Sequence, residues 1–143
     1  MRVLVIIEEP FHTKIRRKVI EQMAKTMLGH LALQKAELSI VLTGDEQIQR
    51  FNRIYRKKDR PTDVLAFPMQ EGELGGVNSE ILGDILISIP TACRQAEKIG
   101  RDLISEVTFL LAHGLLHLLG WDHDTPERDQ QMRAEVDQLC NLT

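Results

Sequence analysis

Two kinds of hydrophobic spacing run through the chain, and the first predicts strands. Short apolar runs, rich in β-branched residues or alternating with polar ones, are typical of strands in a sheet. Four segments have this character: Val3–Ile7, Glu37–Thr43, Asp63–Phe67 and Ile81–Ser88. Between the last two, Met69–Ser79 is rich in glycine and glutamate without an apolar period, which predicts a mobile loop rather than a domain linker.

The second kind of spacing repeats every three or four residues and predicts five helices, each with an apolar side. Helix-starting residues and glycine stops set their bounds. The first helix is opened by Pro10 and directs Ile15, Val19, Met23 and Met27 toward the core, and the second follows a capping box at Thr43–Glu46 and directs Ile48, Phe51 and Ile54 inward. The third and fourth are the short helix Pro90–Ile99 and the strongly apolar helix Asp102–Leu119. The last helix starts at Asp124–Glu127 and carries Met132, Val136 and Leu139 on its apolar side.

These elements predict an α+β fold, a small mixed four-stranded sheet covered by about five helices, with the helix Asp102–Leu119 central. A chain of 143 residues with 43% hydrophobic and 27% charged residues fits a single domain, residues 1–143. The first apolar run is too short for a signal peptide, and the apolar helix is too short to span a membrane. We therefore expect a cytoplasmic protein with no membrane partner.

Three histidines near the end of the apolar helix suggest a metal site. His113 and His117 are four residues apart, so their rings project from one helix face about 6 Å apart along the axis. Gly120 can adopt the left-handed conformation that ends a helix, and the reversed chain can bring His123 back to the pair. Three neutral imidazoles leave one open position on a tetrahedral zinc, which is typical of catalytic sites.

Paired histidines on an apolar helix are more often hydrogen-bonded core residues than ligands. Two buried titratable rings are costly unless something satisfies them, and a third histidine after a glycine stop favours a metal. The prediction is one Zn²⁺ per chain, although three nitrogen ligands would also suit nickel or copper.

The segment before the third predicted strand holds the densest positive charge in an acidic chain. The net charge of -3 argues against indiscriminate binding of nucleic acid, so any contact with RNA needs a local patch. The cations of this patch are Arg50, Arg53, Arg56, Lys57, Lys58 and Arg60. A solvated helix end is the ordinary explanation. An open metal site in the same domain instead suggests a phosphodiester substrate, which needs both an electrophile and fixed cations.

The histidine string HGLLHLLGWDH resembles the motif of the YbeY family, bacterial metal-dependent endoribonucleases that act in ribosomal RNA maturation. A second likeness lies in Asn52–Pro68, where an asparagine and an arginine at a helix end precede TDVLAFP, with Ala66 in place of the usual serine. With ILGDI, the resemblance covers most of Gln47–His123. Metzincin peptidases share the histidine spacing, but Gly114 stands where they carry a glutamate base.

The resemblance implies roles for several residues. Arg56 is expected at the cleft as a catalytic arginine, because a planar guanidinium matches phosphate geometry. Its neighbours Arg53, Lys57 and Lys58 are expected to track the RNA backbone. Two carboxylates are candidates for orienting a histidine ligand from behind. These are Asp84, whose alternative is a backbone anchor in its strand, and Asp122, beside the third histidine.

The function that this resemblance implies is a single-strand-specific, zinc-dependent endoribonuclease. It would act in ribosomal RNA processing, at the 3′ end of 16S ribosomal RNA, and in ribosome quality control, with single-stranded ribosomal RNA and the small ribosomal subunit or its factors as partners. Direct hydrolysis and attack by the ribose 2′-hydroxyl both remain open. The alternatives are a ribosome-associated RNA-binding module with structural zinc and a metallopeptidase-like hydrolase, which Gly114 disfavours.

Overall fold

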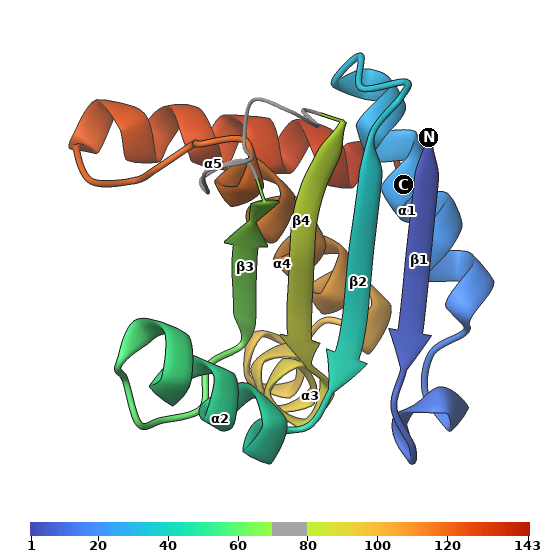
Figure 1. Cartoon of the computed structure of the whole chain (residues 1–143), viewed down its shortest axis with the longest axis vertical. Coiled ribbons are helices and arrows are strands. Elements are labelled where there is room, and N and C mark those ends of the chain that lie inside the picture. Colours follow the sequence, from blue (N-terminus) through green and yellow to red (C-terminus); the bar gives the residue numbers. More distant parts are fainter. Residues whose placement is uncertain (70–79) are drawn as a thin grey trace.

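Within the part of the chain that the structure describes, four strands form one mixed sheet, as the sequence predicted. The computed structural model describes residues 1–69 and 80–143, so the predicted loop Met69–Ser79 falls outside the described residues except for Met69. The strands are β1 (Arg2–Ile7), β2 (Glu37–Thr43), β3 (Val64–Pro68) and β4 (Ile81–Ser88). Their order is β1-β2-β4-β3, in which β1, β2 and β4 run parallel and the edge strand β3 runs antiparallel to β4 (Figure 1).

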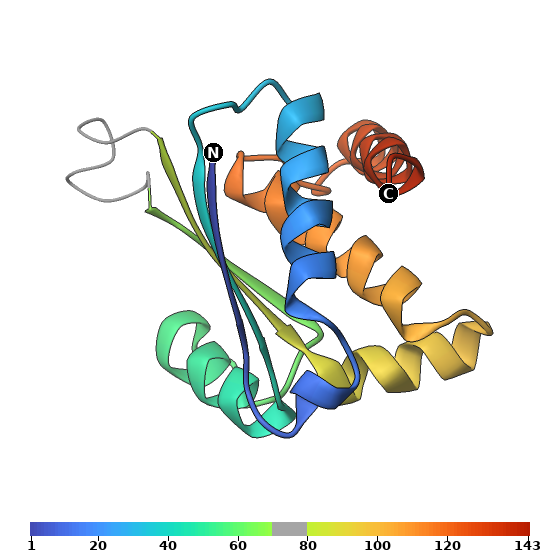
Figure 2. The same cartoon turned by 90° about the vertical axis from the view of Figure 1, so that its right-hand side faces the viewer.

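Five α-helices accompany the sheet in residues 1–69 and 80–143, which confirms the predicted α+β class. They are α1 (Arg17–His30), α2 (Asp45–Arg56), α3 (Ile89–Ile99), α4 (Leu103–Leu118) and α5 (Pro126–Asn141), and a 3-10 turn, η1 (Phe11–Thr13), precedes α1. Seen along the sheet edge, α1, α4 and α5 lie on one side of the strands and α2 lies on the other (Figure 2). Among the described residues, no helix combines the length and the apolar composition needed to span a bilayer.

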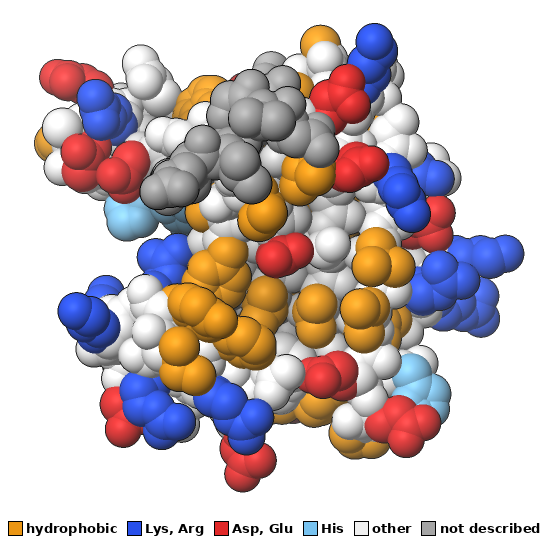
Figure 3. All heavy atoms as spheres, in the orientation of Figure 1, with side chains coloured by type: hydrophobic (Ala, Val, Ile, Leu, Met, Phe, Trp, Pro, Cys, Tyr) orange, Lys and Arg blue, Asp and Glu red, His pale blue; other side chains and the backbone are white. Residues whose placement is uncertain are grey.

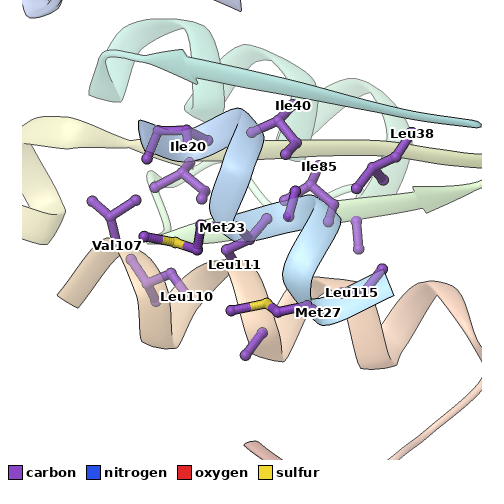
Figure 4. Close-up of a cluster of buried hydrophobic side chains, with 14 of the residues drawn as sticks. Ile20, Met23, Met27, Leu38, Ile40, Ile85, Val107, Leu110, Leu111 and Leu115 are labelled. Atoms are coloured by element: carbon purple, nitrogen blue, oxygen red, sulfur yellow. The ribbon is translucent and has the colours of Figure 1, made fainter. Parts of the chain in front are cut away.

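The main core lies between the sheet, α1 and α4. Side chains from the three elements interdigitate there, and β2 and β4 contribute alternate residues because a strand presents every second side chain to one face (Figure 4). The labelled members in Figure 4 are Ile20, Met23, Met27, Leu38, Ile40, Ile85, Val107, Leu110, Leu111 and Leu115. A smaller cluster on the other face joins Ile48 of α2 to Leu65 and Leu86 of the sheet.

Helix α4 is central, as predicted for the histidine-bearing helix. It packs against β3 and β4 of the sheet and against α1, α3 and α5. The Asp102 side chain accepts a hydrogen bond of 2.9 Å from the Ser105 backbone N–H and so caps the start of the helix. Because α4 is buried on nearly every side, its position is fixed from all directions, which makes it a rigid base for a site.

The start of the first helix differs from the prediction. Pro10 leads into the turn η1, and α1 begins only at Arg17. Ile15 is buried, but it reaches the core from the segment before the helix. The residues that face the core are Ile20, Met23, Ala24, Met27 and Leu28, which follow the helical spacing from the later start. Val19 therefore falls beside this face and is 42% exposed, so its assignment to the core was wrong.

Two further helix starts are shifted by one residue. Gly44, not Thr43, precedes α2, and no side chain caps this helix, so the predicted capping box does not form. Thr43 is instead buried at the end of β2, where its hydroxyl donates to the Glu8 carboxylate. The last helix, α5, is capped by Thr125.

The inward face of α2 also differs from the prediction. Its buried residues are Ile48 and Asn52, so Ile54, which was expected to point inward, lies off this face and is exposed.

Candidate metal centre and its cleft

Three imidazoles converge where α4 ends, as the sequence predicted. The Nε2 atoms of His113 and His117 lie 3.0 Å apart. One ring nitrogen from each of His113, His117 and His123 lies within 4.8 Å of the other two, so the three side chains could together hold a metal ion. The two helix histidines are half-buried and His123 is exposed, so the centre lies at the surface of the core and opens to solvent.

The chain reversal after α4 brings the third histidine to the other two. Gly120 has φ +91°, the left-handed conformation that favours glycine at a helix end. The Gly120 N–H donates to the His117 carbonyl, and the Trp121 N–H donates to the Leu116 carbonyl, each at 3.0 Å. These two bonds close the helix and turn the chain back, and the rings of His117 and His123 consequently lie 5.7 Å apart between centroids.

A backbone carbonyl orients the second histidine. Nδ1 of His117 lies 3.1 Å from the Trp121 carbonyl oxygen. Because a carbonyl only accepts, Nδ1 carries the proton and Nε2 presents its lone pair toward His113. The sequence did not reveal this partner, because every residue type carries a backbone carbonyl. Only the turn at Gly120, which brings the Trp121 carbonyl back to His117, could have suggested it.

Electrostatics keep the two helix histidines neutral. Burial lowers the pKa of His113, and the neighbouring His117 and His123 lower it further against the opposing charge of Asp63. Burial also lowers the pKa of His117, partly offset by its bond to the Trp121 carbonyl. Neutral imidazole is the form that binds a metal, so both rings are ready as ligands at neutral pH.

The donor set fits a divalent metal. Two Nε2 lone pairs that face each other at 3.0 Å repel unless a proton or a cation lies between them. Nitrogen ligands on a tetrahedral zinc are about 3.3 Å apart, given Zn–N distances of about 2.05 Å, which is close to the spacing here. His113, His117 and His123 are therefore suited to hold one metal ion and to leave one position open.

Asp122 contacts the backbone beside the third histidine. Its carboxylate accepts a hydrogen bond of 2.7 Å from the His123 backbone N–H. The contact therefore holds the backbone at His123 and does not involve a ring nitrogen of that histidine. The role of Asp122 in orienting a ligand stays a prediction.

Asp84 lies on the wrong face of the sheet to orient a histidine. On β4 it precedes Ile85, whose side chain packs into the core beneath α4. Side chains alternate along a strand, so Asp84 points to the opposite face, where it borders a shallow hollow with Leu4 and Ser39. The proposed contact between Asp84 and a ligand was wrong, because the apolar run does not reveal which face of β4 the helix covers.

Gly114 has a packing reason to be glycine. A Cβ atom at this position would lie 3.0 Å from Ile85 Cγ2 and 3.2 Å from Val64 Cγ2. Helix α4 therefore approaches β3 and β4 along its Gly114 side, and a side chain here would face the sheet rather than the metal. Any side chain at this position would require Ile85 or Val64 to shift.

A cleft of about 470 Å³ adjoins the histidines. His113, Gly114 and His117 form one wall, and β3 and the end of α2 form the other. The cations that line it are Arg56, Lys58 and Arg60. Figure 3 shows histidine side chains below α5 next to Lys or Arg side chains above α2, at the left margin of the molecule. The arrangement brings fixed positive charge to the open side of the candidate metal centre.

Arg56 lies at the edge of the sheet, in the lining of this cleft. One N–H of its guanidinium donates to the Ala66 carbonyl of β3 at 2.8 Å, and the group lies 5.7 Å from the centre of the Phe67 ring. The bond occupies one of five guanidinium donors and holds the group in place. Among the described residues, no carboxylate lies within 4.0 Å of its nitrogen atoms, so the remaining donors stay available to an anion.

The other predicted RNA-binding residues divide between the cleft and the outer surface. Lys58 lines the cleft, whereas Arg53 is exposed beside Asp59 at 3.9 Å and Lys57 is the left-handed residue that ends α2. The buried side chain of Asn52 donates to the Arg60 carbonyl at 2.9 Å and so shapes the basic loop.

Asp63, at the start of β3, has a role that sequence reasoning missed. Its carboxylate lines the cleft and accepts hydrogen bonds from the Val64 N–H and the Gln95 amide. Burial lowers the pKa of His113, and the charge of Asp63 partly offsets that lowering. The signal was its place in the TDVLAFP string, which marked it only as the first residue of a strand.

The sheet, the central helix and the three imidazoles beside a basic cleft define a small α+β protein with a candidate three-histidine metal centre. A sequence model described as Endoribonuclease YbeY matches residues 7–143. The chain belongs to this family, which confirms the resemblance that its two motifs predicted.

Two relatives in the family are each 46% identical to this chain over the aligned residues. Endoribonuclease YbeY of Geobacter sulfurreducens is 46% identical over 127 residues, 89% of this chain and 82% of the relative. Endoribonuclease YbeY of Aquifex aeolicus is 46% identical over 124 residues, 87% of this chain and 81% of the relative. The solution structure of TM1509 from Thermotoga maritima is similar in fold, with a TM-score of 0.61, 22% identity and coverage of 97% and 89% of the two chains.

Proposed function

We propose that this protein is a metal-dependent endoribonuclease that cuts single-stranded RNA in ribosomal RNA processing. The observation that carries the proposal is the convergence of three histidine nitrogens beside a cleft, which His113 and His117 line together with the cations Arg56, Lys58 and Arg60. Membership of a family whose relatives are named endoribonucleases supports an RNA substrate. The proposal extends to a cytoplasmic location, to the small ribosomal subunit or its factors as partner, and to maturation of the 16S RNA 3′ end and ribosome quality control as tasks.

The residues have distinct roles in this proposal. His113, His117 and His123 hold one zinc ion, which supplies a Lewis acid for a phosphoryl oxygen when bound. The Trp121 carbonyl keeps the proton of His117 on Nδ1, so that Nε2 is free for the metal. Arg56 binds the non-bridging oxygens of the scissile phosphate, because its fork of donors matches them and lies in the same cleft.

The surrounding residues position the strand. Lys58 binds neighbouring phosphates inside the cleft, and Arg53 and Lys57 guide the backbone along the outer surface. Among the described residues, one sheet has a core cluster on each face, and the two clusters together bury residues of all five helices, which favours a single catalytic domain over residues 1–143. The peptidase alternative lacks a base, because Gly114 packs on the sheet.

The test is cleavage of a labelled single-stranded RNA by purified protein, with the same RNA annealed to its complement for comparison. We expect the free strand to be cut, the duplex to resist, and cleavage to stop on chelation or in His117→Ala. His12→Ala is the matched control, since it removes an exposed imidazole from the turn η1. Intact RNA after incubation with fully metallated protein would overturn the proposal, and turnover of a peptide in its place would favour the hydrolase alternative.

A further inference from the structure

Three aromatic rings gather on the outer face of the molecule, across the edge strand from the cleft. Phe51 and Tyr55 of α2 stack with centroids 5.7 Å apart and planes 13° apart. Phe67 of β3 meets Tyr55 edge-on at 5.5 Å. On the face in Figure 3, hydrophobic side chains cover the region of α2 and β3, with Lys and Arg side chains beyond them. We call these three residues the aromatic cluster.

The cluster is held firmly from below and is open above. Phe51 and Phe67 are half-buried against Ile48 and Leu65 of the smaller core. Tyr55 rests on both rings yet is 63% exposed. Single exposed hydrophobic side chains are ordinary, but an exposed ring supported by two others offers a rigid, preformed flat surface.

The cluster is continuous with the cleft through one arginine. Side chains alternate along β3, so that Ala66 faces the main core and Phe67 faces the aromatic side. Arg56 passes around this edge, because its guanidinium binds the Ala66 carbonyl and lies 5.7 Å from the Phe67 ring. A phosphate held by Arg56 therefore has the cleft on one side and the aromatic cluster on the other.

The charge around the cluster matches an RNA strand. Arg50 and Arg53, on the same helix as Tyr55, are exposed. Rings that accept the π-face of any base, beside cations that follow a phosphate backbone, are the combination used to bind single strands. A protein partner would also cover apolar side chains, but it would not need the exposed cations Arg50 and Arg53 on the same helix.

We propose that Phe51, Tyr55 and Phe67 form a base-stacking site for an unpaired nucleobase of the RNA whose backbone lies at Arg56. The inference rests on the proposed function and deepens it. A base within a duplex is stacked on its neighbours and paired, so only an unpaired base can lie on the Tyr55 ring. The cluster would thus provide the preference for single strands, which neither the metal nor the cations can supply.

The test is equilibrium binding of two fluorescent RNA probes. One is a uridine octanucleotide with 2′-O-methyl riboses, and the other is the same octamer with abasic residues in place of the nucleotides. A gel checks that the probes remain intact. Tyr55→Ala should weaken binding of the intact octamer by about 5- to 10-fold, the lower part of the range for one stacked base. It should leave the abasic octamer unchanged, and Tyr55→Trp should restore the intact octamer. Ile54→Ala is the matched control, because Ile54 is the adjacent residue and is 56% exposed.

Three other outcomes separate the possibilities. Equal weakening of both octamers by Tyr55→Ala would make the ring a support for Arg56 and overturn the stacking site. Unchanged binding of both octamers, by a variant that still cleaves RNA, would also overturn the stacking site and would leave the proposed function standing. If the unaltered protein neither binds nor cuts single-stranded RNA, the proposed function fails together with the stacking site.

Discussion

Adding one methyl group to Gly114 tests the packing beneath the metal centre. The new Cβ of Gly114→Ala would lie 3.0 Å from Ile85 Cγ2 and 3.2 Å from Val64 Cγ2, both closer than ordinary contact. Ile85 is fully buried between the sheet and α4, so it has little room to withdraw. Either α4 must move away from the sheet or the two side chains must leave their preferred rotamers.

The expected change combines two opposing effects. Overpacking by a methyl group in a dense core typically costs about 1–3 kcal/mol. Replacing glycine by alanine within a helix returns about 1 kcal/mol. Gly114→Ala should therefore lower the free energy of unfolding by up to about 2 kcal/mol. Gly29→Ala in α1 separates the two effects, because a Cβ there would meet nothing within 4 Å, and this variant should gain up to about 1 kcal/mol.

The assay is urea unfolding of the two variants in metal-free form, with the slope m compared to ensure that the midpoints report stability. Gly114→Ala should be less stable than Gly29→Ala by about 1–3 kcal/mol, the packing cost alone. Gly114→Glu should fail to fold or to bind metal, since it adds a larger group and a charge to the same contact. A Gly114→Ala protein as stable as Gly29→Ala would refute the close approach of α4 to the sheet.

Three other predictions concern charge, metal and protons. Replacing Arg53, Lys57 and Lys58 by alanine should lower the slope of log binding constant against log salt by about 2 for a single-stranded RNA, given about 0.7 per phosphate. The same change in the exposed triplet Arg16–Lys18 should leave that slope unaltered, and equal slopes in both variants would move the RNA surface elsewhere. With free metal at about 100 times Kd as the starting state, chelation should lower the Tm measured by scanning calorimetry by roughly 10 °C. An unchanged Tm would argue against a metal site that stabilises the fold. In the metal-free protein, the imidazoles of His113 and His117 take up protons near pH 6.5 when the chain is unfolded, and only at lower pH when it is folded. Between these two pH values the unfolded state binds more protons, so the free energy of unfolding should fall as the pH drops. Urea unfolding of His117→Ala should show a weaker dependence, and an equal one would contradict the lowered pKa values.

The cluster of three histidines could be predicted because its geometry is local. His113 and His117 share a helix face at any position in a fold, and Gly120 marks the end of that helix. Only a short reversal was then needed to bring back His123. The strands were predictable for the same reason, since a run of apolar β-branched residues reports burial directly.

Other features depend on contacts between distant segments, which a local pattern does not contain. The turn η1 displaces the start of α1, and its Phe11 packs on Gly44 across the fold. The side of β4 to which Asp84 points depends on which face α4 covers. The aromatic cluster joins a helix and a strand: Phe51 and Tyr55 are four residues apart on α2, but no local pattern places Phe67 of β3 beside them.

The most direct test of the account is the single-turnover rate of RNA cleavage by Arg56→Ala, measured at matched metal content and with saturating RNA. If Arg56 stabilises charge that develops on the phosphate oxygens, the rate should fall by about 100-fold or more while RNA affinity changes much less. Arg56→Lys should recover only part of the rate, because a point charge cannot make the bidentate contact. Cleavage by Arg56→Ala at the parental rate would contradict a catalytic role for the cleft, and loss of metal or of the fold would make Arg56 structural.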